Sequence, residues 1–471
     1  MRIKVCALAV LMVASACGSG MTVSYAPDGT AEVLGGEPPY TFHAKEGSTV
    51  QVHPKTGTMV RVGEKSTEVV LGLRHTCAID AEAALWCWGH NRYGQTGSSP
   101  VAMQLRPVRT GTVPRKYKSV GLTNNGTCAV TTGNELYCWG YVNTWHTVEL
   151  EESSPGERLV SGLPGTVKQL AGGFDHMCAL LDEGDVYCWG SNVFATVTGS
   201  LTDVRDYPNP VRVEGVAGAR TIAAGQYRNC AAGEALYCWG WDLSLGSFYS
   251  KVTTLQEAAA ASKTWSDLVY ADPEVATDAL RDALREYATL RMTALPGGAD
   301  GIVIGGLFTC VFSKGRAWCK GVNSFETSPA AVYSTELLQV GKQLEFDRVT
   351  GGGGVLCYEG AATLCTGDLE HLVPEGTYTN GTTPYRFGDG KWNVLRVSSW
   401  LIVKSRACGI DDKGVLYCWG SNEDTVAGDG GKGVNSLPVR VNLSDPIDLN
   451  NENYSITVTD ATGHRVVVKS N

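Results

Sequence analysis

The chain is 471 residues long, carries a formal net charge of −9 at neutral pH, and has only 18% charged residues. This acidic balance argues against nucleic acid and anionic lipid head groups as partners, because both are bound by basic surfaces. The 57 glycines and 12 tryptophans favour a β-rich protein, and no apolar run is long enough to cross a membrane as a helix.

The N-terminus has the composition of an export signal. Residues 1–16 begin with basic residues and continue as a short apolar run, which is typical of a secretory signal peptide. The run ends in Ala-Ser-Ala before Cys17, which resembles the lipobox of bacterial lipoproteins, although leucine is usual where Ala14 stands. The resemblance implies cleavage before Cys17, acylation of Cys17 with palmitate, and a lipid tether over 17–21. A plain secretory signal with an incidental Cys17 is the alternative.

The residue after Cys17 bears on the location of the protein. Gly18 stands where lipoproteins kept in the inner membrane carry an aspartate. The same resemblance therefore implies transport to the outer membrane of a Gram-negative host, where the protein would face the periplasm or the cell surface. The lipid would be its only membrane contact.

Seven cysteine pairs recur along the chain at nearly constant spacing. The first cysteines of successive pairs lie 47 to 52 residues apart, except for one step of 80. A fixed period of this kind indicates one supersecondary unit copied several times. In each copy a turn joins two apolar strands, and a glycine stands two residues after the second cysteine. The pairs are Cys77 with Cys87, Cys128 with Cys138, Cys178 with Cys188, Cys230 with Cys238, Cys310 with Cys319, Cys357 with Cys365, and Cys408 with Cys418.

The paired cysteines predict disulfide bonds within each unit. Apart from Cys6 and Cys17, the 16 cysteines form seven pairs with none left over, as expected in an exported protein. Residues at this spacing on an antiparallel hairpin face each other at a distance that a disulfide can bridge. Structural zinc is the alternative, but zinc sites use much shorter cysteine knuckles. We therefore expect seven disulfides, no metal or cofactor, and no catalytic cysteine.

The repeats resemble those of the regulator of chromosome condensation. The family hallmark is Gly-x-x-His-Thr-Cys-Ala-Leu followed by Cys-Trp-Gly-x-Asn-x-x-Gly-Gln-Leu-Gly. Here it is matched almost throughout by His75-Thr-Cys-Ala-Ile and by Cys87-Trp-Gly-His-Asn-Arg-Tyr-Gly-Gln-Thr-Gly97. The resemblance covers 67–445 and implies a closed, seven-bladed β-propeller with four short strands per blade. It says little about function, because family members range from a nuclear exchange factor to secreted bacterial inhibitors.

The two ends of the chain carry a separate signal. Gly35-Gly-Glu-Pro-Pro-Tyr-Thr-Phe42 and Tyr454-Ser-Ile-Thr-Val-Thr-Asp-Ala-Thr-Gly463 resemble the first and last parts of one bacterial immunoglobulin-like domain. Neither piece has enough strands to bury a sandwich core alone. We expect a small β-sandwich split over 22–66 and 446–471, with the propeller inserted between its parts. Two unrelated flanking hairpins are the alternative.

The one long step between repeats places an insertion at 251–298. Asp272-Pro273 has the residues of a helix start, and an apolar pattern at helical spacing continues to Arg291. We expect a helical hairpin in this insertion. It either packs against its own blade or binds a partner. In the second case Trp265 and Tyr287 are the candidate anchors, because interface energy concentrates in a few aromatic side chains.

The sequence contains no recognisable motif for catalysis or for binding phosphate or metal. Phosphate-binding loops, zinc-protease motifs and nucleophile elbows are all absent from it. His75 and His176 occupy the same repeat position, and we interpret both as structural. We therefore expect an all-β, lipid-anchored monomer that is not an enzyme and that binds or adheres to a protein or glycan partner. An exported propeller enzyme acting on polysaccharide or another envelope polymer is the alternative.

Overall fold

The structure is a computed structural model that forms two compact units. One unit comprises Lys65–Gly428 and Lys432–Val441, and the other contains the two ends of the chain. The structure describes residues 21–25, 31–37, 41–44, 50–52, 58–61, 65–111, 114–141, 157–192, 194–200, 205–241, 291–295, 298–306, 308–323, 332–374, 377, 384–387, 392–400, 403–422, 427–428, 433–443, 455–459, 461–463 and 465–469.

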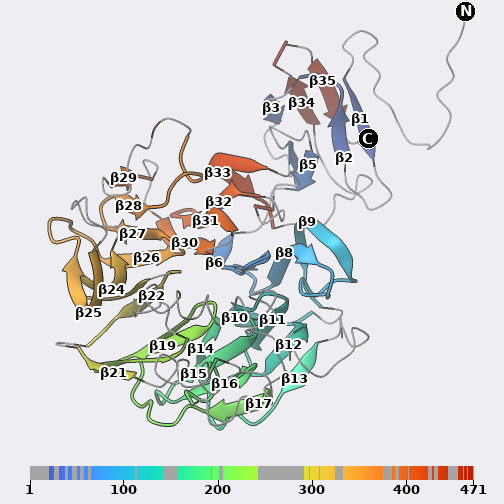
Figure 1. Cartoon of the computed structure of the whole chain (residues 1–471). Coiled ribbons are helices and arrows are strands. Elements are labelled where there is room, and N and C mark those ends of the chain that lie inside the picture. The colour runs from blue at the N-terminus through green and yellow to red at the C-terminus, as the bar shows by residue number, and fades with distance from the viewer. Residues whose placement is uncertain are drawn as a thin grey trace, which may run out of the picture. The chain divides into compact units, whose positions relative to one another are not determined.

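Seven antiparallel four-stranded sheets build the larger unit, and Figure 1 shows them arranged as a ring. In each sheet, or blade, the strands follow one another in chain order, and we name them A to D from the ring axis outward. The A strands of consecutive blades are neighbours, which places them around a central channel. The predicted all-β, seven-bladed propeller is thus confirmed, and the described part of the chain contains no helix.

The strands of the blades have the following bounds. Blades one to four comprise β6 (Ser66–Leu71), β7 (His75–Asp80), β8 (Leu85–Asn91), β9 (Val101–Arg109); β10 (Tyr117–Leu122), β11 (Gly126–Thr131), β12 (Leu136–Gly140), β13 (Arg158–Val160); β14 (Val167–Gly172), β15 (His176–Leu181), β16 (Val186–Gly190), β17 (Tyr207–Arg212); and β18 (Thr221–Ala224), β19 (Arg228–Ala232), β20 (Ala235–Gly240), β21 (Arg291–Ala294). Blades five to seven comprise β22 (Gly301–Ile304), β23 (Phe308–Ser313), β24 (Arg316–Asn323), β25 (Val332–Val340); β26 (Arg348–Gly352), β27 (Val355–Glu359), β28 (Thr363–Gly367), β29 (Tyr385–Arg386); and β30 (Trp392–Trp400), β31 (Val403–Asp411), β32 (Leu416–Ser421), β33 (Val434–Val441).

The seven cysteine pairs all form disulfides between strands B and C of one blade. In every blade the two cysteines are direct cross-strand partners, with Cα atoms 4.0 to 4.1 Å apart. The pairing that the spacing predicted is therefore confirmed in all blades. In blade order Cys77 is bonded to Cys87, Cys128 to Cys138, Cys178 to Cys188, Cys230 to Cys238, Cys310 to Cys319, Cys357 to Cys365, and Cys408 to Cys418.

The glycine two residues after the second cysteine has a backbone reason. Its φ lies between 74° and 105° in all seven blades, a region that side chains disfavour. In four blades the register between strands C and D shifts between the second cysteine and this glycine, which is the mark of a β-bulge. At Gly89 an added Cβ would also lie 2.7 Å from the carbonyl oxygen of Arg74. The Cys-x-Gly motif therefore encodes a bend in strand C.

The hydrophobic core lies between blades. Trp139 of blade two packs with Cys77, Ile79 and Leu85 of blade one, and Trp189 of blade three packs likewise on blade two. The tryptophan after the second cysteine is at most 2% exposed in the five blades that have it. Burying a side chain of this size contributes on the order of 4 kcal/mol. In these five blades the Cys-Trp-Gly motif thereby joins the blade to the preceding one.

The ring closes without an exchanged strand. The first blade takes all four of its strands from 66–109 and the last takes its four from 392–441, so no sheet contains strands from both ends of the propeller. Contacts between blades close the seam instead. The amide of Ser66 donates a hydrogen bond to the carbonyl oxygen of Gly414 at 2.7 Å.

The two ends of the chain form a second unit of two sheets. One sheet has the order β1 (Thr22–Tyr25), β2 (Ala31–Leu34), β5 (Thr58–Arg61), β4 (Val50–Val52), and the other has the order β3 (Thr41–Ala44), β34 (Ser455–Thr459), β35 (Arg465–Lys469). Strand β3 pairs antiparallel with β34, with Phe42 opposite Val458. Segments from the two ends thus share one sheet. The immunoglobulin-like assignment of 22–66 and 446–471 stays a prediction.

The structure corrects the C-terminal boundary of the insertion. Residues 291–294 form β21, the D strand of blade four, in which Met292 pairs with Tyr237 of β20. Arg291 is therefore not helical, because its backbone completes the sheet. The predicted helices, Trp265 and Tyr287 lie outside the described residues, as does Cys17. Among the described residues, no helix is long and apolar enough to cross a membrane.

Candidate functional site

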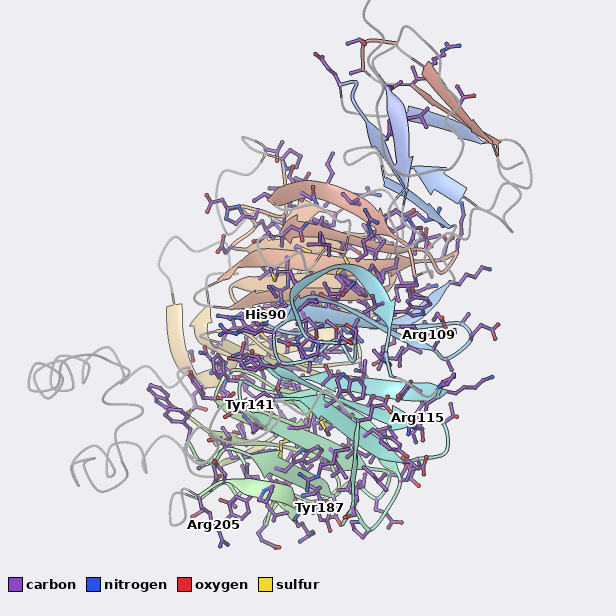
Figure 2. The ribbon with its side chains drawn as sticks, turned by 90° about the vertical axis from the view of Figure 1, so that its right-hand side faces the viewer. His90, Arg109, Arg115, Tyr141, Tyr187 and Arg205 are labelled. Carbon is purple, nitrogen blue, oxygen red and sulfur yellow. A yellow bond between two sulfur atoms is a disulfide. The ribbon has the colours of Figure 1, made fainter. Side chains whose placement is uncertain are left out.

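The strand order gives the propeller two different faces. Successive strands of a blade run in opposite directions, so the A–B turns and the C–D loops emerge on one side of the ring, which we call the AB/CD face. The B–C turns and the connections between blades emerge on the other side. Figure 2 places His90 and Tyr141, from the ends of two C strands, on one side of the ring, and Arg109 and Arg115 on the other. Strand β20 ends and strand β21 begins on the AB/CD face.

A cavity of about 190 Å³ occupies the mouth of the central channel on the AB/CD face. Its lining includes one equivalent A-strand residue of every blade, and each of these residues pairs with the residue just before the first cysteine of that blade. The sequence supplies large aliphatic side chains in four blades and small residues in three. In blade order they are Leu71, Leu122, Gly172, Ala224, Ile304, Gly351 and Val397.

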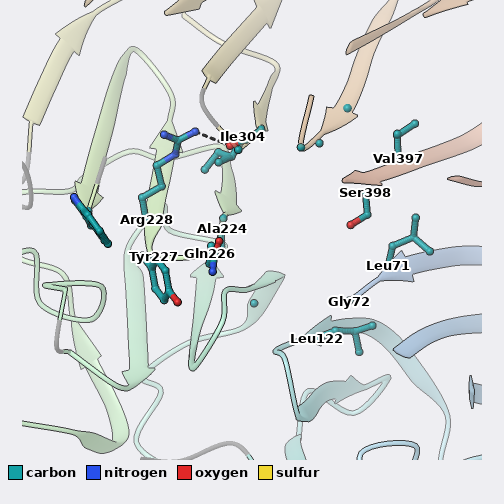
Figure 3. A pocket seen from close by; sticks show the side chains of 18 residues that line it. Leu71, Gly72, Leu122, Ala224, Gln226, Tyr227, Arg228, Ile304, Val397 and Ser398 are labelled. Atoms are coloured by element: carbon teal, nitrogen blue, oxygen red, sulfur yellow. Dashed lines mark hydrogen bonds between the residues drawn. The ribbon is translucent and has the colours of Figure 1, made fainter. Parts of the chain in front are cut away.

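Polar groups lie nearer the rim of this cavity. Gln226, Tyr227 and Ser398 contribute side chains, as seen in Figure 3, and glycine turns from several blades contribute backbone. Arg228 is the one charged residue among the described residues that line the cavity, and its guanidinium donates a hydrogen bond to the carbonyl oxygen of Gly305 at 2.7 Å. The cavity therefore combines an aliphatic ring with a neutral polar rim.

Four aromatic side chains from blades three and four adjoin the cavity. The rings of Phe194 and Trp241 stack with centroids 5.2 Å apart, and Tyr227 lies 4.6 Å from Phe194. Phe174 completes the group at 5.6 Å from Tyr227. The amide of Trp241 donates to the carbonyl oxygen of Tyr227 at 2.7 Å, which holds the C–D loop against the A–B turn. We call these four residues the aromatic cluster; Phe194 is buried and the others are half-buried.

A second group of polar side chains lies on the same face. Tyr93 and Tyr141 from blades one and two have ring centroids 5.7 Å apart. Burial raises the pKa of Tyr141, and the carboxylates of Asp175 and Asp206 raise it further. Burial, with the neighbouring charge of Asp206, raises the pKa of Asp175 to about 8. Asp175 is therefore largely protonated at neutral pH.

The position two residues before the first cysteine links each of four blades to the next. The ring of His75 donates from Nε2 to Thr127 Oγ1 at 2.8 Å, because that hydroxyl itself donates to the carbonyl oxygen of Gln95. His176 Nε2 contacts Asn229 Oδ1 at the same distance. Burial lowers the pKa of His75 to about 3, with Arg406 and His90 adding to the shift. Burial likewise lowers the pKa of His176 to about 4.

In two further blades arginine holds this linking position. Arg228 bonds Gly305 of blade five, and Arg406 donates to Gly72 and to Leu73 of blade one. The prediction that the two repeat-position histidines have a structural role agrees with these contacts. No cluster of three or more potential metal ligands occurs in the described part of the chain.

The aliphatic side chains around the cavity and the aromatic cluster were not predicted from the sequence. Tyr227 stands in the A–B turn of blade four, and Trp241 directly follows the Cys-Trp-Gly motif of the same blade. The other blades carry different residues at these two positions. Neither belongs to a recognisable motif, so the available signal was only their aromatic character at repeat positions on one face. The predicted anchors Trp265 and Tyr287 belong to the C–D loop of the same blade.

Comparison with known proteins supports the repeat assignment. The family model for the regulator of chromosome condensation (RCC1) repeat matches residues 67–95 and 167–195, which lie in blades one and three. Among curated proteins, the ultraviolet-B receptor UVR8 of Arabidopsis thaliana is 31% identical over 31% of this chain and 33% of its own length. The mitochondrial RCC1 domain-containing protein RUG3 of the same plant is 28% identical over 36% and 41%. The chain thus spans well under half the length of these relatives.

Solved structures align with this chain at low identity. Human WBSCR16 aligns with a TM-score of 0.48 and 17% identity, over 87% of this chain and 96% of its own. The ectodomain of the Physcomitrella patens receptor kinase CR4 aligns with a TM-score of 0.41 and 16% identity, over 76% and 74%. The family-model matches and the seven four-stranded sheets show that the chain carries RCC1-like repeats in a seven-bladed propeller.

Proposed function

We propose that this chain is an exported binding module that recognises a protein partner with the AB/CD face of its propeller. The aromatic cluster carries the proposal. Its stacked rings stand half-buried beside an open cavity, and binding energy at protein interfaces concentrates in a few aromatic side chains of this kind. A relative of the chain is named as a receptor, which is compatible with a recognition role.

The decisive experiment is capture of partners by the folded propeller from bacterial envelope extracts. Trp241→Ala should abolish retention of the partner, because it removes the exposed end of the stack. Tyr187→Ala is the matched control: Tyr187 is another half-buried aromatic residue, but it stands near the start of strand β16, next to the B–C turn. If Trp241→Ala retains the partner as well as Tyr187→Ala does, the AB/CD face is excluded as the binding surface. Loss of capture after deglycosylation of the extract would assign the partner to the glycans.

Anchoring to the envelope is the second part of the proposal. The lipobox-like residues before Cys17 support acylation of that cysteine, which would hold the propeller at the outer membrane. Cells fed labelled palmitate should label the wild-type protein, and Cys17→Ala should remain unlabelled and unprocessed. Labelling that survives this substitution would reject the anchor.

One observation favours an exported polysaccharide-cleaving enzyme as the alternative. Glycosidases act with a pair of carboxyl groups, and burial together with the charge of Asp206 raises the pKa of Asp175 to about 8. Incubation with purified envelope polysaccharides would decide this alternative. Products formed by the wild type but not by Asp175→Asn would establish hydrolysis.

A further inference from the structure

We propose that the cavity at the channel mouth receives one large apolar side chain, aromatic or branched aliphatic, that projects from the protein partner along the ring axis. The inference rests on the proposed function of the AB/CD face and names the group that this face would recognise. It follows from the shape of the cavity, the chemistry of its wall and the charges around it.

One repeat position contributes to the wall of the cavity in every blade. It carries Leu71, Leu122, Ile304 and Val397 in four blades, and a glycine or alanine in blades three, four and six. At Gly172 and Gly351 backbone carbonyl oxygens leave no room for a side chain. The cavity between these positions has a volume of about 190 Å³. An apolar cavity of about 150 Å³ is already large enough to bind benzene. A single large side chain fits, and because all seven blades surround the cavity it must enter end-on.

The charges around the cavity favour a neutral group. Four aliphatic side chains form the ring, and no carboxylate is among the described residues that line it. The only cation among these lining residues, Arg228, is buried and donates to the backbone of blade five, so its charge is already engaged. A charged ligand would lose its hydration without gaining a counter-charge.

The aromatic cluster then serves as one side of the rim around the inserted group. Tyr227 and Trp241 line the cavity and continue outward to Phe194 and Phe174. An anchor side chain surrounded by contacts that exclude water is the arrangement in which interface energy is largest. Figure 3 shows Leu71, Leu122 and Val397 across the cavity from Tyr227.

Small probes can test the cavity before the partner is known. N-acetyl-tryptophanamide and N-acetyl-leucinamide should shift the methyl NMR signals of Leu71, Leu122, Ile304 and Val397 with millimolar affinity. N-acetyl-lysinamide, N-acetyl-glutamate amide and methyl N-acetylglucosaminide should leave these signals in place. Stronger shifts with the saccharide, or none with either apolar amide, would overturn the inference.

A variant that fills the cavity provides the matching test. Ala224→Leu should weaken both apolar amides at least tenfold, because Leu71 and Leu122 show that the same position accepts leucine in two other blades. Ala81→Leu adds the same group at an exposed B–C turn and should change nothing. Unchanged amide binding by Ala224→Leu would reject the cavity as the site.

The two proposals can fail separately. If Trp241→Ala abolishes partner capture while Ala224→Leu retains it fully, the face binds but the cavity does not hold the anchor. If both variants retain the partner, the proposed function fails as well. Loss of capture in both variants, with Ala81→Leu unaffected and equal melting temperatures, is the result that we expect.

Discussion

The guanidinium of Arg406 in the last blade donates a hydrogen bond to the carbonyl oxygen of Leu73 in the first blade, at 2.8 Å. It also donates to the carbonyl oxygen of Gly72, and the side chain is only 3% exposed. Because no strand is exchanged across this seam, Arg406 holds together two blades that are otherwise far apart in the sequence. Arg228 makes the same kind of link between blades four and five, which follow each other along the chain.

Replacing Arg406 with methionine should therefore open the seam. The change leaves two buried carbonyl oxygens without their donor and should lower the free energy of unfolding by roughly 2–4 kcal/mol, measured by chemical denaturation. Amide exchange should accelerate in blades one and seven. Arg228→Met is the control and should accelerate exchange locally without opening the seam. Identical exchange patterns in the two variants would contradict this role.

The seven disulfides should be present in the unreduced mature protein, with no free thiol among their 14 cysteines. Each bond closes a short loop and should contribute about 2–3 kcal/mol. Peptide mapping by mass spectrometry checks the pairing, and Cys77→Ala with Cys87→Ala measures one bond. Cross-links between blades, or zinc in the purified protein, would refute the assignment.

The two buried histidines should make the protein sensitive to acid. Both stay neutral in the folded state down to about pH 4, because burial lowers their pKa values, whereas an unfolded histidine gains a proton near pH 6.5. The contribution of these two histidines to the free energy of unfolding is therefore complete above about pH 6.5. It falls as the pH decreases towards 4, by up to about 1.4 kcal/mol per pH unit and histidine.

The matched variants isolate this effect from other titrating groups. Burial raises the pKa of Glu68 to about 7, which stabilises the fold as the pH falls and so acts in the opposite direction. His75→Gln with His176→Gln keeps a hydrogen-bond donor at each link and removes the titration. Denaturation between pH 7 and 4 should show a smaller acid loss in the double variant. Parallel curves for the two proteins would disprove the assignment.

Deleting 446–471 should unfold the unit of the two chain ends and spare the propeller. The deletion removes β34, the partner of β3. Limited proteolysis should then cut within 22–64 while 65–441 stays intact. An N-terminal segment that resists proteolysis in the deletion variant would show that it folds without the C-terminal strands.

Two replacements of the insertion should differ in their effect on stability. Exchanging 251–290 for a short glycine-serine linker should leave the melting temperature almost unchanged, because loop length costs only about 0.6 kcal/mol per doubling. Exchanging 251–298 also removes β21 and should lower the melting temperature by several degrees. Equal melting temperatures would mean that β21 contributes nothing to blade four. Partner capture by the first variant shows whether Trp265 and Tyr287 are needed.

The sequence by itself determined the features that depend on neighbouring residues. Cys77 and Cys87 lie across one hairpin, so their spacing alone predicts their bond, and the repeat of that hairpin predicts seven blades. The bulge glycines follow from the same local ladder of hydrogen bonds. Short elements were harder to predict from the sequence. Strand β21 has only four residues, and a helical pattern that continues to Arg291 concealed it.

Only the tertiary structure decided what the ring brings together. Leu71 and Val397 are separated by most of the propeller, yet they face one cavity because the last blade closes on the first. The stacking of Phe194 on Trp241 joins blades three and four, because loops of neighbouring blades meet on the AB/CD face. Periodicity shows that such positions are equivalent, but the side chain that each blade places there acquires its role only when the seven A strands meet around one axis.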